Sequence, residues 1–347
     1  MKKVIKDSLL KANKYRYHQK HKRIALVALK NIEEDTGYRL SSSQKKIIND
    51  YSKEVLGSSV YKYWLYVYTA FNKKFVEGWI PDNYFGDIVA PKINKGIGKI
   101  ANVKTLSKRI VNSNLFPDKY YLIDNLLYDS EFNLVEFDDL YNEINNGQEL
   151  FIKRDNSNQG KGVLKLNRKN FNKEILLTFG DSVIQKSIIQ NAWFDRITPA
   201  SVATVRITTV KEFDGKVKMR AAYLRVGTGD SHVVKSASAI RVPIINREGK
   251  LGDYGADPNW KRHTKHPDTG FKFSGEKIPY FSKAVEECEK LHSKLPHFSI
   301  IGWDVSITNE GEIKIMEWNA NHPGIKFSEA SMGPCFSGLN WEKLWKL

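Results

Sequence analysis

The sequence predicts an α+β fold in which a mostly helical N-terminal region precedes two units built from strands and helices. Two stretches within residues 1–76 carry apolar side chains at helical spacing. Residues 150–166 alternate as two short strands around a glycine-containing loop, and residues 301–324 have the pattern of a β-hairpin. The 347 residues suffice for two or three domains. We expect a helical region at 1–90, a small unit at 91–189 and a larger unit at 190–347.

Composition narrows the class of protein. Apolar residues make up 41% of the chain and aromatic residues 12%, which is typical of a folded globular protein. Cys288 and Cys335 fit neither a disulfide framework nor a metal-ligand spacing. We find no cleavable signal sequence or long apolar run, so we expect a cytoplasmic protein. The net charge of +16 favours anionic partners without choosing among them.

The N-terminus is the most basic segment, with ten Lys and Arg against the single acid Asp7 before residue 31. Val4, Ile5, Leu9 and Leu10 recur at helical spacing and predict an amphipathic helix. Its basic face suits an anionic membrane surface or an acidic polymer, but a solvated helix face explains it equally well. Residues 42–76 predict a further helix capped within 41–43, with an aromatic stripe that is expected to pack in the core.

The middle of the chain predicts a helix at 100–111, a strand at 120–123 and a helix at 137–146. Two strands follow at 150–154 and 162–166, joined by a loop in which Gly160 and Gly162 let backbone amides approach phosphate oxygens and Lys161 adds charge. The spacing is not that of a P-loop, because no G-x-x-x-x-G-K-[ST] run or helix start is present. Another β-prone run covers 181–189.

Arginines alternate with apolar residues on two long strands at 199–210 and 216–226, which flank the Asp214-Gly215 turn. Arg206 and Arg225 are candidates for stabilising charge in phosphoryl transfer, since a planar guanidinium matches phosphate oxygens. The alternative for any strand arginine is solvation or an ion pair. The polar segment 246–280 holds His263 and His266 and is expected to be a surface or substrate-facing loop. A helix is expected at 281–295.

The hairpin at 301–324 carries the clearest chemical pattern. Alternation places Asp304, Ser306 and Thr308 on one face of its first strand, and Ile313, Ile315 and Glu317 on one face of its second. Asn319 follows on the Glu317 face if the backbone stays extended. The hairpin brings Asp304 level with Glu317 and Asn319, and three such oxygen ligands suit Mg²⁺ bound through nucleotide phosphates.

This D-x₁₂-E-x-N pattern resembles the metal-binding end of the ATP-grasp superfamily. The resemblance implies an ATP-grasp fold, in which two α+β subdomains grip ATP after the helical N-terminal region. It implies that Lys104 or Lys99, and Lys153, contact the nucleotide, and that Gly160, Lys161 and Gly162 form a lid over the triphosphate. Residues 181–189 would be the hinge, with the Gln185 side chain and the Lys186 and Ile188 backbone contacting adenine. Gln190 and Asn191 stand where many members carry an acid for the ribose.

The chain resembles more narrowly the branch associated with sugar transfer in bacterial surface-polysaccharide clusters. The matching segments are QKSIIQ, SVATVRITT, AAYLRVG and GWD…EWN. The branch usually has a glycine-rich stretch where this chain has Ser236-Ala237-Ser238-Ala239 after Lys235. Amino-acid ligases of the superfamily often carry an arginine where this chain has Gly302, so Arg206 or Arg225 must supply that charge. The resemblance implies substrate contacts from Lys235, Ser236, Ser238 and Asn321, with His322 and residues 328–334 on the acceptor side.

The expected activity is that of an ATP-dependent carboxylate–amine ligase using ATP and Mg²⁺. An acidic sugar or glycan carboxylate would be activated as an acyl phosphate and joined to an amino acid or other amine. One alternative is a kinase that phosphorylates a sugar hydroxyl at the same ATP site, which differs in the acceptor. The other is a non-enzymatic binder of an anionic polymer or membrane, which the metal hairpin disfavours. The sequence carries no nucleic-acid recognition motif, so no nucleic-acid partner is expected.

Overall fold

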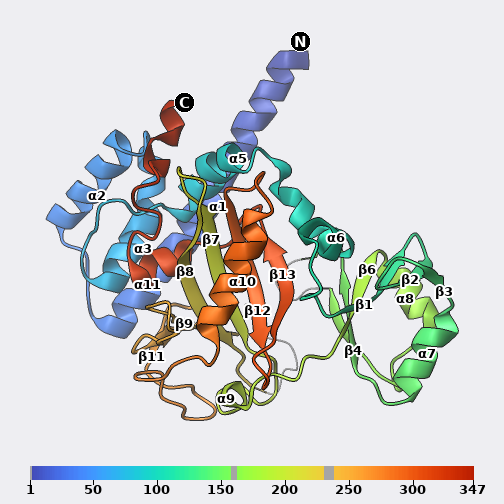
Figure 1. The fold of residues 1–347 in the computed structure, drawn as a ribbon. Coiled ribbons are helices and arrows are strands. Elements are labelled where there is room, and N and C mark those ends of the chain that lie inside the picture. Colours follow the sequence, from blue (N-terminus) through green and yellow to red (C-terminus); the bar gives the residue numbers. More distant parts are fainter. Residues whose placement is uncertain (1, 158–161, 230–237) are drawn as a thin grey trace.

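The computed structural model describes residues 2–157, 162–229 and 238–347. Among these residues two β-sheets form, and both are antiparallel throughout. The strand order is β3-β2-β1-β6-β4-β5 in one, which we call the small sheet, and β11-β10-β9-β8-β7-β12-β13 in the other, the large sheet (Figure 1). The α+β class is therefore confirmed in its layout of sheets and helices.

The N-terminal region is helical, as expected. The long helix α1 (Lys2–Thr36) packs against α3 (Lys62–Asn72), and its first turns project from the body (Figure 1). The segment expected as one helix at 42–76 is divided into α2 (Ser42–Glu54), the short helix η1 (Ser59–Tyr61) and α3. Ser41 caps α2 through a capping box with Gln44. The helix stops before Gly57, whose φ of +80° is left-handed.

A series of short helical segments connects the N-terminal region to the small sheet. They are α4 (Asp82–Tyr84), the π-helical turn η2 (Phe85–Val89), α5 (Ala90–Ile93), η3 (Ile97–Asn102), η4 (Lys104–Leu106) and α6 (Ser107–Val111). The helix expected at 100–111 is thus divided between 3₁₀ turns up to Leu106 and the α-helix α6. Buried Asn94 fixes this connection, because its side chain accepts from the Ser299 amide and donates to the Ile300 carbonyl at the start of β12.

The small sheet contains β1 (Asp118–Ile123), β2 (Leu126–Asp129), β3 (Leu134–Val135), β4 (Leu150–Arg154), β5 (Val163–Leu166) and β6 (Ser182–Lys186). Two helices, α7 (Phe137–Asn145) and α8 (Lys173–Phe179), pack on it around a core that includes Leu122, Ile152 and Ile184. The strands expected at 120–123, 150–154 and 162–166 lie within one or two residues of β1, β4 and β5.

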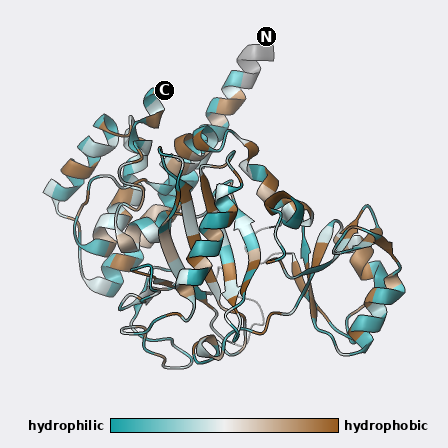
Figure 2. Ribbon diagram, in the orientation of Figure 1, coloured by the Kyte–Doolittle hydropathy of each residue, from teal (hydrophilic) through white to brown (hydrophobic). Residues whose placement is uncertain are grey.

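The large sheet contains β7 (Thr204–Lys211), β8 (Val217–Val226), β9 (Ile240–Pro243), β10 (Gly255–Ala256), β11 (Arg262–His263), β12 (Ile300–Ile307) and β13 (Ile313–Asn319). Helix α10 (Phe281–Ser293) covers one face, against buried Ile207, Leu224 and Trp303, and α9 (Ala192–Asp195) precedes β7. Hydrophobic residues recur along the central strands (Figure 2). The opposite face of the same strands carries charged side chains.

The cores divide the chain differently from the expected boundaries at 90 and 190. Ala101, Val111 and Phe116, expected in the small unit, pack in the core of the large sheet. At the other end of the chain, α11 (Lys326–Met332) and η5 (Trp341–Lys346) return to the N-terminal helices, where Phe327 and Trp341 join their core. The helical region is therefore built from both termini. Within the described residues, every helix is too short or too polar to cross a lipid bilayer.

Candidate active site

A β-bulge at Met316 brings the predicted metal ligands onto one face of the large sheet. Asp304 pairs with Glu317 and Gly302 with Asn319, whereas the next pair is Val305 with Ile315, so Met316 is the extra residue. Residues paired across antiparallel strands share a face. The expectation that Ile313, Ile315 and Glu317 share a face is therefore wrong. The two isoleucines point into the core, and the bulge turns Glu317 toward Asp304.

Asp304 is held by two arginines from neighbouring strands. Arg206 on β7 forms a bidentate pair with it, with Nε–Oδ1 at 2.6 Å and Nη2–Oδ2 at 2.9 Å. Arg225 on β8 lies 3.8 Å from Oδ1. Burial would raise the pKa of Asp304, but these two guanidinium groups hold it below its usual value. Asp304 is therefore a charged, fixed carboxylate in the centre of the sheet.

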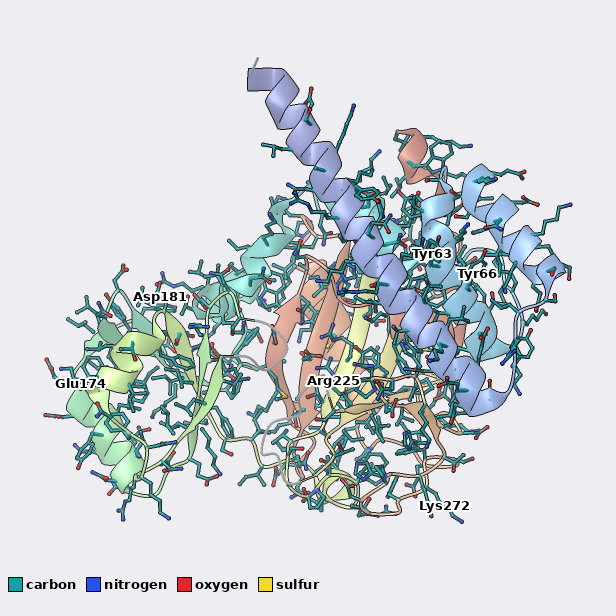
Figure 3. The ribbon with its side chains drawn as sticks, turned by 180° about the vertical axis from the view of Figure 1, so that it is seen from behind. Tyr63, Tyr66, Glu174, Asp181, Arg225 and Lys272 are labelled. Carbon is teal, nitrogen blue, oxygen red and sulfur yellow. The ribbon has the colours of Figure 1, made fainter. Side chains whose placement is uncertain are left out.

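Arg225 and Arg241 surround Tyr223 with positive charge. The registers Arg206–Tyr223, Thr204–Arg225 and Arg225–Arg241 place these side chains on the face that carries Asp304. Burial acts to raise the pKa of Tyr223, but the three arginines lower it overall. Burial lowers the pKa of Arg241. Figure 3 shows Arg225 over the central strands, between the small sheet and α1.

Tyr223 and Arg241 are thus site residues that the sequence reasoning did not assign. The sequence leaves open whether Tyr223 or Leu224 shares the Arg225 face, and β9 lies directly after a segment with no strand pattern. Only the pairing of β8 with β9 reveals Arg241. Arg220, by contrast, pairs with Glu212 at the far end of β8 and lies outside the site.

Lys104, and not Lys99, reaches the site. Lys104 is buried, with Nζ 3.8 Å from Glu317 Oε1 and a hydrogen bond of 2.8 Å to the Ser157 carbonyl. Lys99 is exposed. Thr105 next to Lys104 donates from both its amide and its hydroxyl to Asp155. The first residues of the loop after β4 are therefore anchored to the segment that carries Lys104.

Lys153 links the small sheet to the bulge. Its Nζ lies 3.4 Å from the carbonyl oxygen of Met316, and burial lowers its pKa despite the nearby charges of Glu317 and Asp118. Gln185 is buried beside it and donates to Asp118 Oδ1 at 2.7 Å. The Gln185 amide, expected to meet adenine, is thus engaged by Asp118. Burial raises the pKa of Asp118, which also accepts from Tyr121.

The hinge residues and the two amides that follow them make hydrogen bonds within the protein. The Lys186 amide donates to the Pro117 carbonyl while its side chain is exposed, and Ile188 is half-buried just beyond β6. Gln190 is buried, accepts from the Ala203 amide and donates to Asp195. Asn191 caps α9 and donates to the Thr308 carbonyl. Both amides are thus hydrogen-bonded within the protein, and the suggestion that they take the place of the family acid at the ribose stays a prediction.

Asp304, Glu317 and Asn319 fit a hard divalent cation by chemistry. Two carboxylates and an amide provide oxygen donors on one face, with Glu317 about a third exposed at 31%. The Asn319 Nδ2 atom is buried without a hydrogen-bond partner in the described chain, so no bond at that atom fixes the orientation of the amide. The described residues contain no metal-holding group of three or more His, Cys, Asp or Glu side chains. To hold a divalent cation, the two carboxylates therefore need Asn319 and oxygen atoms from a bound ligand.

Several predicted residues lie at the margins. Gly160, Lys161, Lys235 and Ser236 fall outside the described residues. Gly162 has a φ of +105°, which only glycine adopts easily. The Ser238 carbonyl accepts from Thr228, and Asn321 is exposed directly after the metal hairpin. The segment 246–280 was expected to be a surface or substrate-facing loop. His266 is instead buried against the Gly227 carbonyl.

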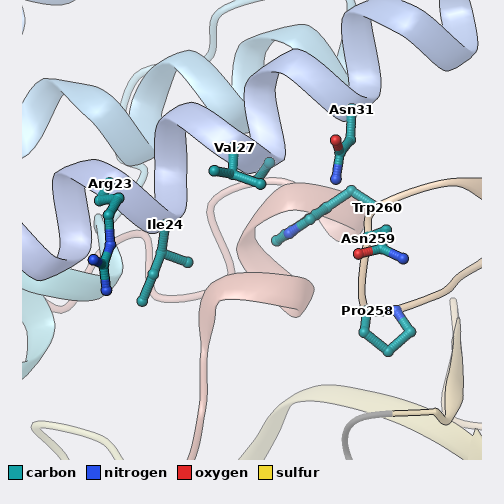
Figure 4. Close-up of a pocket in the computed structure, with 8 residues that line it drawn as sticks. Arg23, Ile24, Val27, Asn31, Pro258, Asn259 and Trp260 are labelled. Carbon is teal, nitrogen blue, oxygen red and sulfur yellow. The ribbon is translucent and has the colours of Figure 1, made fainter.

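A separate cavity of about 240 Å³ lies between α1 and the turn at 258–260. Figure 4 shows Trp260 beneath α1. The α1 residues Arg23 and Asn31 lie at opposite ends of the cavity. None of the predicted site residues lines it, and the Trp260 ring is largely covered by Trp64 and Phe71.

Two antiparallel subdomains that meet at a lysine–carboxylate–arginine face, with a loop between β4 and β5, define an ATP-grasp enzyme. The particular family follows from a profile described as sugar-transfer associated ATP-grasp, which matches residues 99–339 and therefore well over half of the chain. The chain belongs to this family.

Solved structures with a related fold are similar at low identity. The ATP-grasp ligase PsnB complexed with minimal precursor has a TM-score of 0.42 at 13% identity, covering 72% of this chain and 64% of that one. The MgADP-bound biotin carboxylase domain of Hydrogenobacter thermophilus 2-oxoglutarate carboxylase has 0.41 at 12%, covering 71% and 45%. N5-carboxyaminoimidazole ribonucleotide synthetase from Thermotoga maritima has 0.35 at 12%, covering 64% and 42%.

The chain spans less than two thirds of the length of these three structures. We draw no functional conclusion from likenesses this low. A comparison with functionally curated proteins gave no match.

Proposed function

We propose that this protein is an ATP-dependent, ADP-forming carboxylate–amine ligase. Its substrates would be an acidic sugar of a bacterial capsule or O-antigen and an amino acid or other amine. The observation that carries the proposal is the pair Asp304–Glu317, with Lys104 beside one carboxylate and Arg225 beside the other. Family membership supports the use of ATP.

The first step forms an acyl phosphate. A carboxylate oxygen of the sugar acid bonds to the γ-phosphorus of ATP, and the bond from that phosphorus to the β–γ bridging oxygen breaks to release ADP. Charge on the transferring phosphoryl group is stabilised by Lys104 and Arg225. Arg225 suits this role because its Nε is buried with no hydrogen-bond partner among the described residues, whereas Arg206 is committed to Asp304.

The second step forms the amide. The neutral amine attacks the acyl carbon, a C–N bond forms, and the bond from that carbon to the phosphate oxygen breaks. The N–H proton leaves with inorganic phosphate as hydrogen phosphate. Exclusion of water matters here, because water would hydrolyse the acyl phosphate, and the anchoring of Asp155 and Ser157 beside Lys104 supports a lid that starts at this point.

Asp304, Glu317 and Asn319 are the residues that would hold Mg²⁺. When bound, the ion supplies charge neutralisation and orientation to the β- and γ-phosphates of ATP. Lys153 in β4 and residues 182–186 of the hinge, which form β6, are neighbours in the small sheet, and Lys153 reaches the bulge beside Glu317. These residues would contact the nucleotide.

ADP release from the purified protein against a panel of uronic acids, with and without amino acids, tests the proposal. We expect ADP release that requires both a carboxylate and Mg²⁺, a hydroxamate when hydroxylamine is added, and an amide in the product by mass analysis. A stable phosphomonoester formed without any amine, and no hydroxamate, would identify a sugar kinase instead.

We also propose that α1 brings the enzyme to an anionic membrane surface. Leu9 and Leu10 are each 57% exposed on the projecting part of α1. The lysines around them face a single carboxylate nearby in sequence, that of Asp7. Sedimentation with phosphatidylglycerol vesicles is expected and should fall with added salt, whereas phosphatidylcholine vesicles should leave the protein in solution. Equal sedimentation with both would remove this proposal.

A further inference from the structure

A cluster of polar side chains is buried where α1 and α4 meet the segment that follows β13. It consists of Tyr17 and His21 from α1, Asp82 from α4, and His322, and we call it the Asp82 cluster. Asp82 is 5% exposed. Asn83, next to it in α4, instead faces His18 and the Val60 carbonyl. The sequence reasoning assigned only His322, to the acceptor side, and the proposed mechanism uses none of the four.

Among the described residues, no Lys or Arg side chain is paired with the Asp82 carboxylate. Its only ion-pair contacts in the described chain are His21 Nδ1 at 3.7 Å and His322 Nε2 at 3.6 Å. Trp64 donates its indole N–H to His21 Nδ1 at 3.1 Å, so this nitrogen is an acceptor and His21 is the neutral tautomer. Burial accordingly lowers the pKa of His21 to about 4. His21 therefore does not neutralise Asp82.

The neighbouring Asp87 provides a contrast within the same packing layer. It accepts from Tyr61 at 2.7 Å, pairs with Lys14 at 2.9 Å and lies 3.4 Å from His18 Nε2. Asp87 is thus balanced by the protein itself. Lys326, whose charge acts on His21, instead lies 5.2 Å from the centre of the Trp64 ring. A buried carboxylate without a partner is costly and calls for an explanation.

The unpaired atoms of the cluster share one chemistry. Asp82 Oδ1 and Tyr17 Oη are both buried without a hydrogen-bond partner in the described residues, and each can accept. Gly86 in the π-helical turn η2 allows this packing, because a Cβ there would collide with the Tyr17 hydroxyl and come within 3.4 Å of His322 Nε2. A donor with positive charge would satisfy these acceptors.

One short segment connects the cluster with the proposed active site. His322 is 32% exposed and forms the outer edge of the cluster. Three residues before it, Asn319 is a proposed metal ligand, and immediately after it the Pro323 carbonyl accepts from Arg206. Residues 319–323 therefore contact the Asp304 face on one side and Asp82 on the other.

We propose that the Asp82 cluster is the binding subsite for the protonated amino group of the nucleophile substrate. A primary ammonium group has three donors and no acceptor, and its charge complements Asp82. Because the nucleophile is the neutral amine, the bound ammonium group first gives one proton to the Asp82 carboxylate, and His322 borders the route from this subsite to the acyl phosphate. The proposal rests on the ligase function, since it names the element that receives the amine.

Binding can be measured without turnover on the full-length protein. The probe is methylammonium chloride, titrated while the side-chain nitrogens of His21 and His322 are followed by ¹H–¹⁵N NMR and assigned through His21→Gln and His322→Gln. We expect a saturable shift of both histidines, at least tenfold weaker binding in Asp82→Asn, and wild-type binding in Asp87→Asn. Tetramethylammonium, which has no N–H donor, should produce no shift.

The competing occupants give different results. An equal shift with sodium or potassium chloride would indicate a metal cation site, and an absence of any saturable shift would indicate buried water only; either overturns the proposal. Stability provides a second criterion. Asp82→Asn should unfold at or above the wild-type temperature because it removes an unbalanced charge, whereas Asp87→Asn should unfold below it. A large loss of stability in Asp82→Asn would mark that carboxylate as structural.

The catalytic consequence separates this inference from the proposed function. With a carboxylate that supports ADP release, Asp82→Asn should raise KM for the amine at least tenfold, whereas Asp87→Asn should leave that KM within about twofold of wild type. An unchanged KM contradicts the subsite. If no carboxylate supports ADP release in the wild type, the ligase proposal fails, while the ammonium titration still decides whether the cluster binds amines.

Discussion

Asp304 and Glu317 lie opposite each other across β12 and β13, and the bulge at Met316 is what turns Glu317 to the side of Asp304. The same bulge exposes the Met316 carbonyl to Lys153 of the small sheet. One extra residue in β13 therefore sets both the carboxylate pair and a contact between the two sheets. The two carboxylates nevertheless differ in surroundings, since Asp304 is 7% exposed at its side chain and Glu317 is 31% exposed.

This difference predicts separate consequences for the two carboxylates. Glu317→Gln should lower Mg²⁺-dependent ATP turnover at least 100-fold and leave the melting temperature nearly unchanged, because its neighbour Lys104 keeps the hydrogen bond to Ser157. Turnover by ADP release and melting by circular dichroism check both parts. Wild-type turnover in this variant would remove Glu317 from the metal site.

Removal of Asp304 should damage the fold as well as activity. Asp304→Ala leaves Arg206 buried without its carboxylate, and breaking such a pair costs about 3–5 kcal/mol. The double variant Asp304→Ala/Arg206→Met should recover most of that loss, because it removes the isolated charge. Urea denaturation of the two single variants and the double variant measures the coupling. Additive losses would mean that the two side chains do not interact as a pair.

Lys104 and Lys99 form a matched test of the nucleotide contact. Lys104→Met should reduce kcat/KM for ATP about 100-fold, since it removes the buried charge next to Glu317. Lys99→Met should stay within about twofold of wild type, because that side chain is exposed. Steady-state kinetics with varied ATP provide the measurement. A larger effect at Lys99 would contradict the assignment.

Local patterns were sufficient to predict much of this fold. Alternation around 150–166 gave β4 and β5, and the Asp304, Glu317 and Asn319 spacing identified a hairpin whose ends come together. The face of Glu317 was mispredicted because strict alternation assumes a regular strand, and Met316 carries no composition signal for a bulge. Arg206 and Arg225 could be nominated from their strands, but not ranked.

Other parts of the site depend on contacts between distant segments. Asp118 engages Gln185 across 67 residues, and Asp82 meets His322 across 240 residues (322 minus 82), so neither relationship has a local signature. Lys99 and Lys104 carry the same charge on neighbouring turns, and only packing separates them. The resemblance to a family supplied the order of the elements, whereas tertiary pairing decided which side chains meet.

His292 gives a pH-dependent contribution to stability. It is buried in α10, with its Nε2–H donating to the Phe298 carbonyl at 3.0 Å and Nδ1 accepting from Thr209 at 2.7 Å, an arrangement that requires the neutral ring. Burial lowers its pKa from 6.5 to about 4. The unfolded chain therefore binds a proton at a higher pH than the folded protein does.

The contribution of His292 is fully present above pH 6.5 and is lost as the pH falls toward 4, by up to about 3 kcal/mol. Urea denaturation of wild type and His292→Gln at pH values from 4 to 8 isolates this contribution, since other titrating groups are common to both. We expect the variant to be less stable at pH 7, and the difference to shrink steadily as the pH falls below 6.5, since only the wild type must then bury a ring that would otherwise be charged. A difference that stays constant across this range would mean that His292 titrates normally in the folded protein.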